Sequence, residues 1–174
     1  MKKVFTTKRL CRAGVIAALY VALTYAFGPL PFIPPLQVRP AEALCILPLF
    51  FPEAVPALYV GCMLSNISSP YVVYDVFLGS LATLIAAFGT YMVGRFFKND
   101  GFRILLGGLF PVLCNAIIIP IVIVFLCNGT VGYESATAAY FAYALSLFLS
   151  ESLWVYGLGT PLYFLLKKLL PHKK

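Results

Sequence analysis

Glu151 is a carboxylate in a stretch, residues 136–166, that otherwise carries no charge and that ends in Lys167 and Lys168. Such a stretch is typical of a membrane span, where an ionisable side chain is costly to bury and usually faces a cavity. Counted from Lys167 at 1.5 Å per residue, Glu151 lies about 24 Å from the basic end, in the outer half of the membrane. We therefore expect Glu151 to have a function.

Other polar and aromatic side chains are expected near the same side of the membrane. The same helical rise, counted from Arg103, places Asn115 at about 18 Å, and Trp154 shares a helix face with Glu151 because it follows three residues later. Together these side chains predict a pocket for a flat, polar ligand. The candidate binding residues are Arg39, Glu42, Asn66, Tyr71, Asp75, Asn115, Glu151 and Trp154.

Several of these residues also have a structural interpretation. Asp75 precedes an apolar run, as a helix N-cap does, whereas Asn66 fits a helix C-cap. Arg39 and Glu42 stand three residues apart at a predicted helix start and can pair with each other. Trp154 also fits a lipid-facing or core position. A purely structural interpretation is harder to sustain for the two deepest polar residues, Glu151 and Asn115, because an unpaired polar group in the membrane costs several kcal/mol.

The composition is that of a membrane protein. Hydrophobic residues make up 61% of the 174 residues, charged residues 11%, and the mean hydropathy is +0.94. This leaves too little polar surface to coat a soluble globule. A span needs about 20 apolar residues, so there is room for about six. We expect an all-α protein of six transmembrane helices in a single substrate-binding domain, residues 1–174.

The basic residues mark one side of the membrane. The net charge of +7 is concentrated in three clusters, at residues 2–12, 95–103 and 167–174. These clusters flank apolar runs, which is the positive-inside pattern and not the stripe of a nucleic-acid-binding protein. If all three clusters are cytoplasmic, an even number of spans separates consecutive clusters. Both termini are then cytoplasmic.

This parity predicts six helical segments. Four long apolar runs occupy about residues 13–27, 76–94, 103–125 and 136–166. Between the first two runs, Phe51-Pro52-Glu53 divides an apolar stretch into short helices at about 41–50 and 53–65, because proline and glutamate favour the first turn of a new helix. Neither short helix can cross the hydrocarbon alone, so their ends should contact protein or water.

The sequence lacks the residues of common enzymes. Its one histidine, His172, lies in the basic tail, so the spans contain no HExxH zinc site and no histidine for acid-base chemistry. There is no G-x-x-x-x-G-K-[ST] loop for ATP, and the five cysteines have no metal or redox spacing. We predict a binding or transport protein without catalytic residues, metal or cofactor.

Four segments resemble a known family. They are RPAEAL at 39–44, LPLFFPEAVP at 47–56, GCMLSN at 61–66 and DVFLGSLATL at 75–84. They resemble the QueT family, the queuosine-precursor S-components (substrate-binding subunits) of energy-coupling factor (ECF) transporters, and the resemblance extends over residues 13–161. The chain departs from the family pattern at Ala41, where serine usually precedes the glutamate, and at Ala57, where glycine is common.

The resemblance implies a six-helix S-component bundle in the cell membrane of a prokaryote. Such a subunit captures its solute outside the cell and joins a T-component that carries two ATPases, which agrees with the missing ATP loop. In the family the T-component docks on small residues of the first span. Two rows here have the spacing that lets helices approach closely, although ordinary packing within the chain uses the same spacing. The rows are Ala13 with Ala17, and Gly14 with Ala18 and Ala22.

The implied ligand is a 7-deazaguanine, such as 7-cyano-7-deazaguanine, its aminomethyl derivative or queuine. A guanine-type edge offers adjacent N–H donors to one carboxylate, while an amide meets the carbonyl and ring nitrogen. An aromatic side chain stacks on the ring, and a second carboxylate suits an aminomethyl cation. The candidates are Glu151 or Glu42 for the first carboxylate, Asn115 or Asn66 for the amide, Trp154 or Tyr71 for stacking, and Asp75 for the cation.

Two other functions are compatible with the residues. A stand-alone secondary transporter driven by protons would use Glu151 as its protonatable site and would need no ATPase. A membrane-assembly subunit without transport activity would bind no solute and would tolerate Glu151→Gln.

Overall fold

A computed structural model describes residues 6–33, 37–130 and 132–170, which form helices and connections without a β-strand. His172 and the outermost lysines of the first and third basic clusters lie outside these residues. The helices are α1 (Thr7–Ala26), η1 (Leu30–Phe32), η2 (Pro40–Leu49), α2 (Ala54–Asn66), α3 (Val72–Tyr74), η3 (Asp75–Gly79), α4 (Ser80–Phe96), α5 (Asp100–Ile121), η4 (Val122–Leu126), α6 (Ala136–Gly157) and α7 (Gly159–Leu169).

Four helical stretches are long and apolar enough to cross a membrane, and they correspond to the four expected apolar runs. They are Thr7–Ala26, Val72–Phe96, Asp100–Leu126 and Ala136–Leu169. The first begins earlier than expected because residues of the basic cluster form its first turns. The chain is therefore a multi-pass helical membrane protein, while the count of six spans stays a prediction.

Local sequence signals explain where two spans begin and where one bends. The side chain of Asn99 accepts a hydrogen bond from the Gly101 N–H over 2.9 Å at the start of α5. Ser135 accepts one from the Ala138 N–H over 3.2 Å at the start of α6. Such caps satisfy N–H groups that lack a partner within the helix. The last span is interrupted at Leu158, between Gly157 and Gly159, because glycine is a weak helix former.

The short helix η2 lies at the centre of the bundle. All of its residues are buried, and it contacts α1, α2, α4, α5, α6 and α7. It is a 3₁₀-helix, which at about 2.0 Å per residue is too short to cross about 30 Å of hydrocarbon. Its complete burial meets the expectation that a short segment at membrane depth must contact protein.

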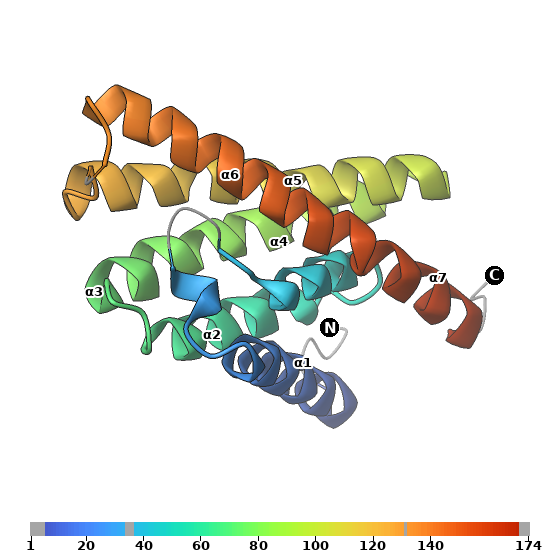
Figure 1. Cartoon of the computed structure of the whole chain (residues 1–174). Coiled ribbons are helices and arrows are strands. Elements are labelled where there is room, and N and C mark those ends of the chain that lie inside the picture. Colours follow the sequence, from blue (N-terminus) through green and yellow to red (C-terminus); the bar gives the residue numbers. More distant parts are fainter. Residues whose placement is uncertain (1–5, 34–36, 131, 171–174) are drawn as a thin grey trace.

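The longer helices pack around η2 in a regular order. In Figure 1, α4, α5 and α6 run alongside one another, and the contacts continue from α4 to α2 and from α2 to α1. Glycine allows one of these close approaches, because a Cβ on Gly61 of α2 would lie 2.9 Å from Cβ of Tyr20 and 3.1 Å from the carbonyl oxygen of Ala17, both on α1. This contact brings Tyr20 into the centre of the bundle.

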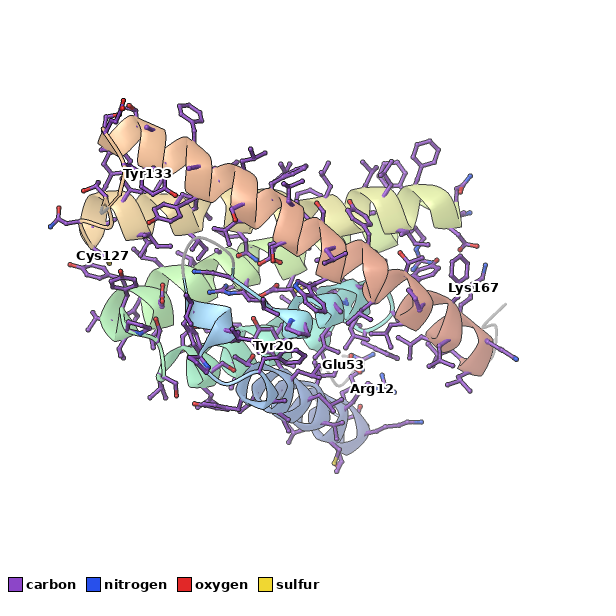
Figure 2. The ribbon with its side chains drawn as sticks, viewed as in Figure 1. Arg12, Tyr20, Glu53, Cys127, Tyr133 and Lys167 are labelled. Carbon is purple, nitrogen blue, oxygen red and sulfur yellow. The ribbon has the colours of Figure 1, made fainter. Side chains whose placement is uncertain are left out.

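The described ends of the chain meet at one end of the bundle, which we call the basic end. Thr6 and Leu170 line the same cavity there. Arg12 of α1 forms an ion pair with Glu53 over 2.5 Å. Figure 2 shows Arg12, Glu53 and Lys167 on one side of the molecule.

The opposite end collects the remaining connections. Cys127 and Tyr133 lie there in Figure 2, far from Lys167. The hydroxyls of Tyr25, on α1, and Ser68, after α2, are hydrogen bonded over 2.8 Å. This two-ended arrangement is the one that the parity of the basic clusters requires. The side of the membrane that each end faces stays a prediction.

Candidate binding site

Glu42 lies near the start of η2 and is fully buried, with 0% of its surface exposed. Its two carboxylate oxygens each accept a hydrogen bond. The Tyr20 hydroxyl donates to Oε1 over 2.6 Å, and the Cys45 thiol donates to Oε2 over 3.1 Å. These partners offset part of the cost of burying a carboxylate. Glu42 thus joins α1 to the central helix, and Figure 2 shows Tyr20 directed from α1 into the bundle.

Glu151 and Asn115 form the second part of the buried polar group. Asn115, on α5, donates through Nδ2 to Oε1 of Glu151, on α6, over 3.2 Å. Each side chain is 1% exposed. Oε2 of Glu151 and Oδ1 of Asn115 are buried and have no hydrogen-bond partner in the described part of the chain. Two acceptors are therefore available in a region where unpartnered polar atoms are costly.

Arg39 supplies the positive charge of this group. It is buried, and its Nε donates to the carbonyl oxygen of Pro31 over 3.2 Å. Its guanidinium interacts electrostatically with both Glu42 and Glu151. Arg39 and Glu42, both within the described residues, form no direct ion pair, so the interpretation of these two residues as a simple pair was wrong. Arg39 is thus a buried cation close enough to both carboxylates to attract them.

Gln37 was missed by the sequence analysis. Its side chain is buried, and its Oε1 has no hydrogen-bond partner within the described residues. Its carbonyl oxygen accepts a hydrogen bond from the Ser150 hydroxyl over 2.5 Å, which places Gln37 beside the residue that precedes Glu151. A neutral amide in a proline-rich connection carries no charge or periodicity signal, so only its burial identifies it.

Asn66 lies at the edge of the buried group, where its amide has a structural partner. A narrow cavity is lined by Tyr20, Thr24, Pro31, Phe32, Arg39, Ala41, Ser65 and Asn66. Nδ2 of Asn66 donates to the carbonyl oxygen of Asp75 over 2.7 Å. Asn66 therefore borders a cavity with Arg39 and also connects the end of α2 to the start of η3.

Asp75 and Tyr71 lie apart from Glu42 and Glu151. Asp75 is the first residue of η3, inside a continuous helical stretch, so its interpretation as an N-cap was wrong. Its carboxylate accepts a hydrogen bond from the Ser69 hydroxyl, and the same hydroxyl oxygen accepts one from the Tyr71 N–H over 3.1 Å. These contacts order the turn between α2 and α3.

Trp154 packs against the ring of Phe27, the residue that follows α1. Its ring centroid lies 6.2 Å from that of Phe27 at an interplanar angle of 65°, an edge-to-face arrangement. The structure thus brings Arg39, Glu42, Asn115 and Glu151 together, with Asn66 at the edge, and gives Trp154 a ring partner of its own.

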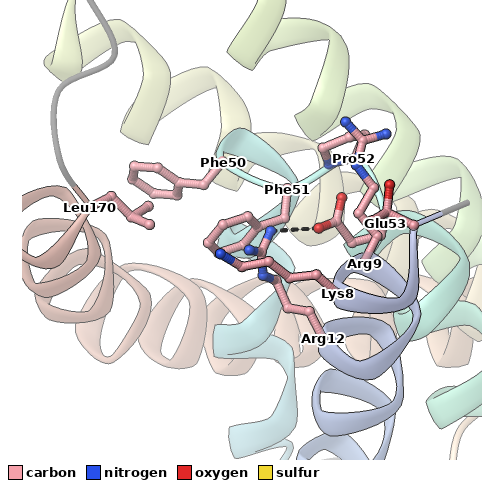
Figure 3. A pocket seen from close by; sticks show the side chains of 9 residues that line it. Lys8, Arg9, Arg12, Phe50, Phe51, Pro52, Glu53 and Leu170 are labelled. Carbon is pink, nitrogen blue, oxygen red and sulfur yellow. Dashed lines mark hydrogen bonds and ion pairs between the residues drawn. The ribbon is translucent and has the colours of Figure 1, made fainter. Parts of the chain in front are cut away.

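A larger cavity, of about 520 Å³, lies at the basic end and shares no residue with this group. Figure 3 shows it, with the Arg12–Glu53 ion pair across it. Its lining residues are Thr6, Lys8, Arg9, Arg12, Phe50, Phe51, Pro52, Glu53 and Leu170. Cavity size therefore does not identify the candidate site, whereas buried acceptors without a partner do.

The two rows of small residues on α1 face different surroundings. Ala13 and Ala17 pack against the core, where Ala17 lies against Gly61. Gly14, Ala18 and Ala22 are exposed. The first row is therefore used for packing within the chain, and only the second row is a free face.

The fold and the site together define a multi-pass helical membrane protein with a buried polar group that is only partly partnered within the described residues. Residues 10–168 match the family model described as QueT transporter, so the chain belongs to the QueT transporter family. This agrees with the expectation of a transporter and not an enzyme.

A curated relative is the queuosine precursor transporter QueT of Lactococcus lactis subsp. cremoris (strain MG1363), 38% identical over 92 residues. The match covers 51% of this chain and 53% of the relative, so it spans about half of either protein. No solved structure shows a significant match.

Proposed function

We propose that the chain is the S-component of an ECF importer and binds a queuosine precursor of the 7-deazaguanine class between α5, α6 and η2. The observation that carries this proposal is the pair of buried, unpartnered oxygens on Glu151 and Asn115. The name of the Lactococcus relative supports the choice of solute.

The chemistry of a deazaguanine edge suits these atoms. Its ring N1–H and 2-amino group are adjacent donors, and a carboxylate and an amide oxygen side by side can accept from both. Arg39 lines the narrow cavity and is the cation available to the ring carbonyl. The unpartnered oxygens of Glu151 and Asn115 do not line this narrow cavity, so side chains around them have to shift when a deazaguanine enters.

The proposed assembly follows from the remaining features. As an S-component without an ATP-binding loop of its own, the chain depends on a T-component with two ATPases for transport. The exposed row Gly14, Ala18 and Ala22 is the proposed docking face for the T-component. The basic end, with both termini, faces the cytoplasm of a prokaryotic cell, and residues 1–174 act as one domain with six membrane segments.

An uptake experiment tests this function. Cells without their own deazaguanine uptake are given labelled 7-aminomethyl-7-deazaguanine while they express the chain alone, the chain with a T-component and its ATPases, or the same set with the P-loop lysine of each ATPase replaced. We expect accumulation only with the intact set.

The other outcomes identify the alternatives. Accumulation with the chain alone would favour a proton-driven transporter. If there is no uptake and native mass spectrometry finds no co-purified base, the result would favour a membrane-assembly subunit.

A further inference from the structure

We propose that Gln37 is a further substrate-binding residue, whose amide oxygen accepts a hydrogen bond from the ligand, so that the site selects bases presenting at least three adjacent N–H donors. This inference rests on the proposed function and names a selectivity for the same site.

The burial of Gln37 is the first observation. The side chain is 5% exposed, and Oε1 is fully buried without a partner in the described residues. Gln37 is the only glutamine of the chain. An unpartnered buried amide oxygen is costly, and a ligand donor would recover that cost on binding.

The chain is held in place at Gln37 and just after it. The Ser150 hydroxyl donates to the Gln37 carbonyl oxygen over 2.5 Å, and Ser150 directly precedes Glu151 on α6. Two residues further along the chain, Nε of Arg39 donates to the carbonyl oxygen of Pro31 over 3.2 Å. Gln37 is therefore fixed between the cation of the site and the helix that carries Glu151.

The unpartnered atoms indicate the hydrogen-bonding pattern of the ligand. Oε1 of Gln37, Oδ1 of Asn115 and Oε2 of Glu151 are all acceptors. In the described residues, the fourth buried atom without a partner is Nε of Arg103, whose guanidinium binds the Leu49 carbonyl at the basic end. The site thus offers three acceptors, and a complementary ligand has to bring donors.

A 2-amino-substituted base meets this requirement. Ring N1–H and the two hydrogens of the 2-amino group give 7-deazaguanine three adjacent donors, whereas 7-deazahypoxanthine has the same rings without the amino group. We expect the site to discriminate strongly between them, since a missing ligand donor leaves buried acceptors unpaired.

Calorimetric titration of the purified chain with both bases tests this inference. Gln37→Met keeps the length of the side chain and removes the acceptor, and we expect it to weaken binding of 7-deazaguanine about tenfold or more. Its effect on 7-deazahypoxanthine should stay below about twofold, because this base lacks the 2-amino group that would donate to Gln37. Gln37→Asn keeps the amide but shortens the side chain, which moves the amide oxygen away from the ligand. It should show the same pattern, and it replaces Gln37→Met as the test if that variant does not fold.

The outcomes separate the two proposals. Equal weakening of both bases by Gln37→Met, or no weakening of either, overturns the inference while the proposed function stands. A wild-type chain that binds neither base overturns the proposed function and the inference with it.

Discussion

Asn115 and Glu151 are hydrogen bonded to each other across the contact between α5 and α6, over 3.2 Å, and each keeps one buried oxygen that no described residue partners. A buried polar pair that serves packing alone is expected to be satisfied, because a half-satisfied pair costs more than apolar side chains would. In the proposed function, a donor-bearing solute completes the pair.

Glu151→Gln tests the carboxylate directly. The change preserves the shape of the side chain but replaces an acceptor oxygen with a donor, so we expect a loss of about 2–4 kcal/mol in ligand affinity with normal expression. Calorimetry with a 7-deazaguanine measures the loss. Glu134→Gln, the same change at an exposed position outside the spans, is the matched control and should bind like the wild type. Wild-type affinity in Glu151→Gln would remove this residue from the site.

Gly61→Ala tests the close approach of α1 and α2. The new Cβ would meet Tyr20 and the backbone of Ala17 at about 3 Å, and backbone cannot move aside as a side chain tip can. We expect a loss of about 1–3 kcal/mol of stability, together with weaker ligand binding, because Tyr20 is displaced from Glu42. Thermal unfolding in detergent measures the first effect. Gly14→Ala, where nothing lies within 4 Å, should be neutral or slightly stabilising, and equal destabilisation by both changes would contradict the packing argument.

Ala18→Leu tests the proposed docking face. Ala18 is exposed in the middle of the second small-residue row, so a larger side chain should block close approach of a partner helix without disturbing the bundle. We expect ligand binding to persist and co-purification of the T-component with its ATPases to fall at least about tenfold. Ala138→Leu, at an exposed position of α6, is the control for added bulk. Full assembly of Ala18→Leu would exclude this face.

Single cysteines test which end of the bundle faces outward. In the turn after α2, Ser69 is buried against Asp75, whereas Ser68 is exposed and suits labelling. In intact cells an impermeant thiol reagent should label cysteine at Ser68 and Glu134, and it should reach cysteine at Lys98 only after lysis.

The background for this test needs few changes. Cys45 and Cys62 are buried and can stay, so only Cys11, Cys114 and Cys127 are replaced. Labelling of Lys98→Cys from outside would show that the predicted orientation is reversed. The proposed site would then be separated from the external solute.

The class of protein and the position of its segments follow from the sequence alone. Long apolar runs, basic flanks and the Phe51-Pro52-Glu53 break are local properties, so they predicted four spans and two short helices within a few residues. The missing nucleotide loop and the family motifs are local as well. Glu151 and Asn115 were identified because a polar side chain deep in an apolar run is informative by itself.

The tertiary structure decided which side chains meet. Helical periodicity places a residue on a face of its own helix but does not say which neighbour covers that face. The pairing of Asn115 with Glu151, the burial of Arg39 near both carboxylates and the contact of Trp154 with Phe27 therefore required the packed bundle. The two small-residue rows on α1 were equivalent by spacing, and only the contact of Ala17 with Gly61 distinguishes them. Gln37 depends on tertiary structure in the same way, since burial creates its unpartnered oxygen.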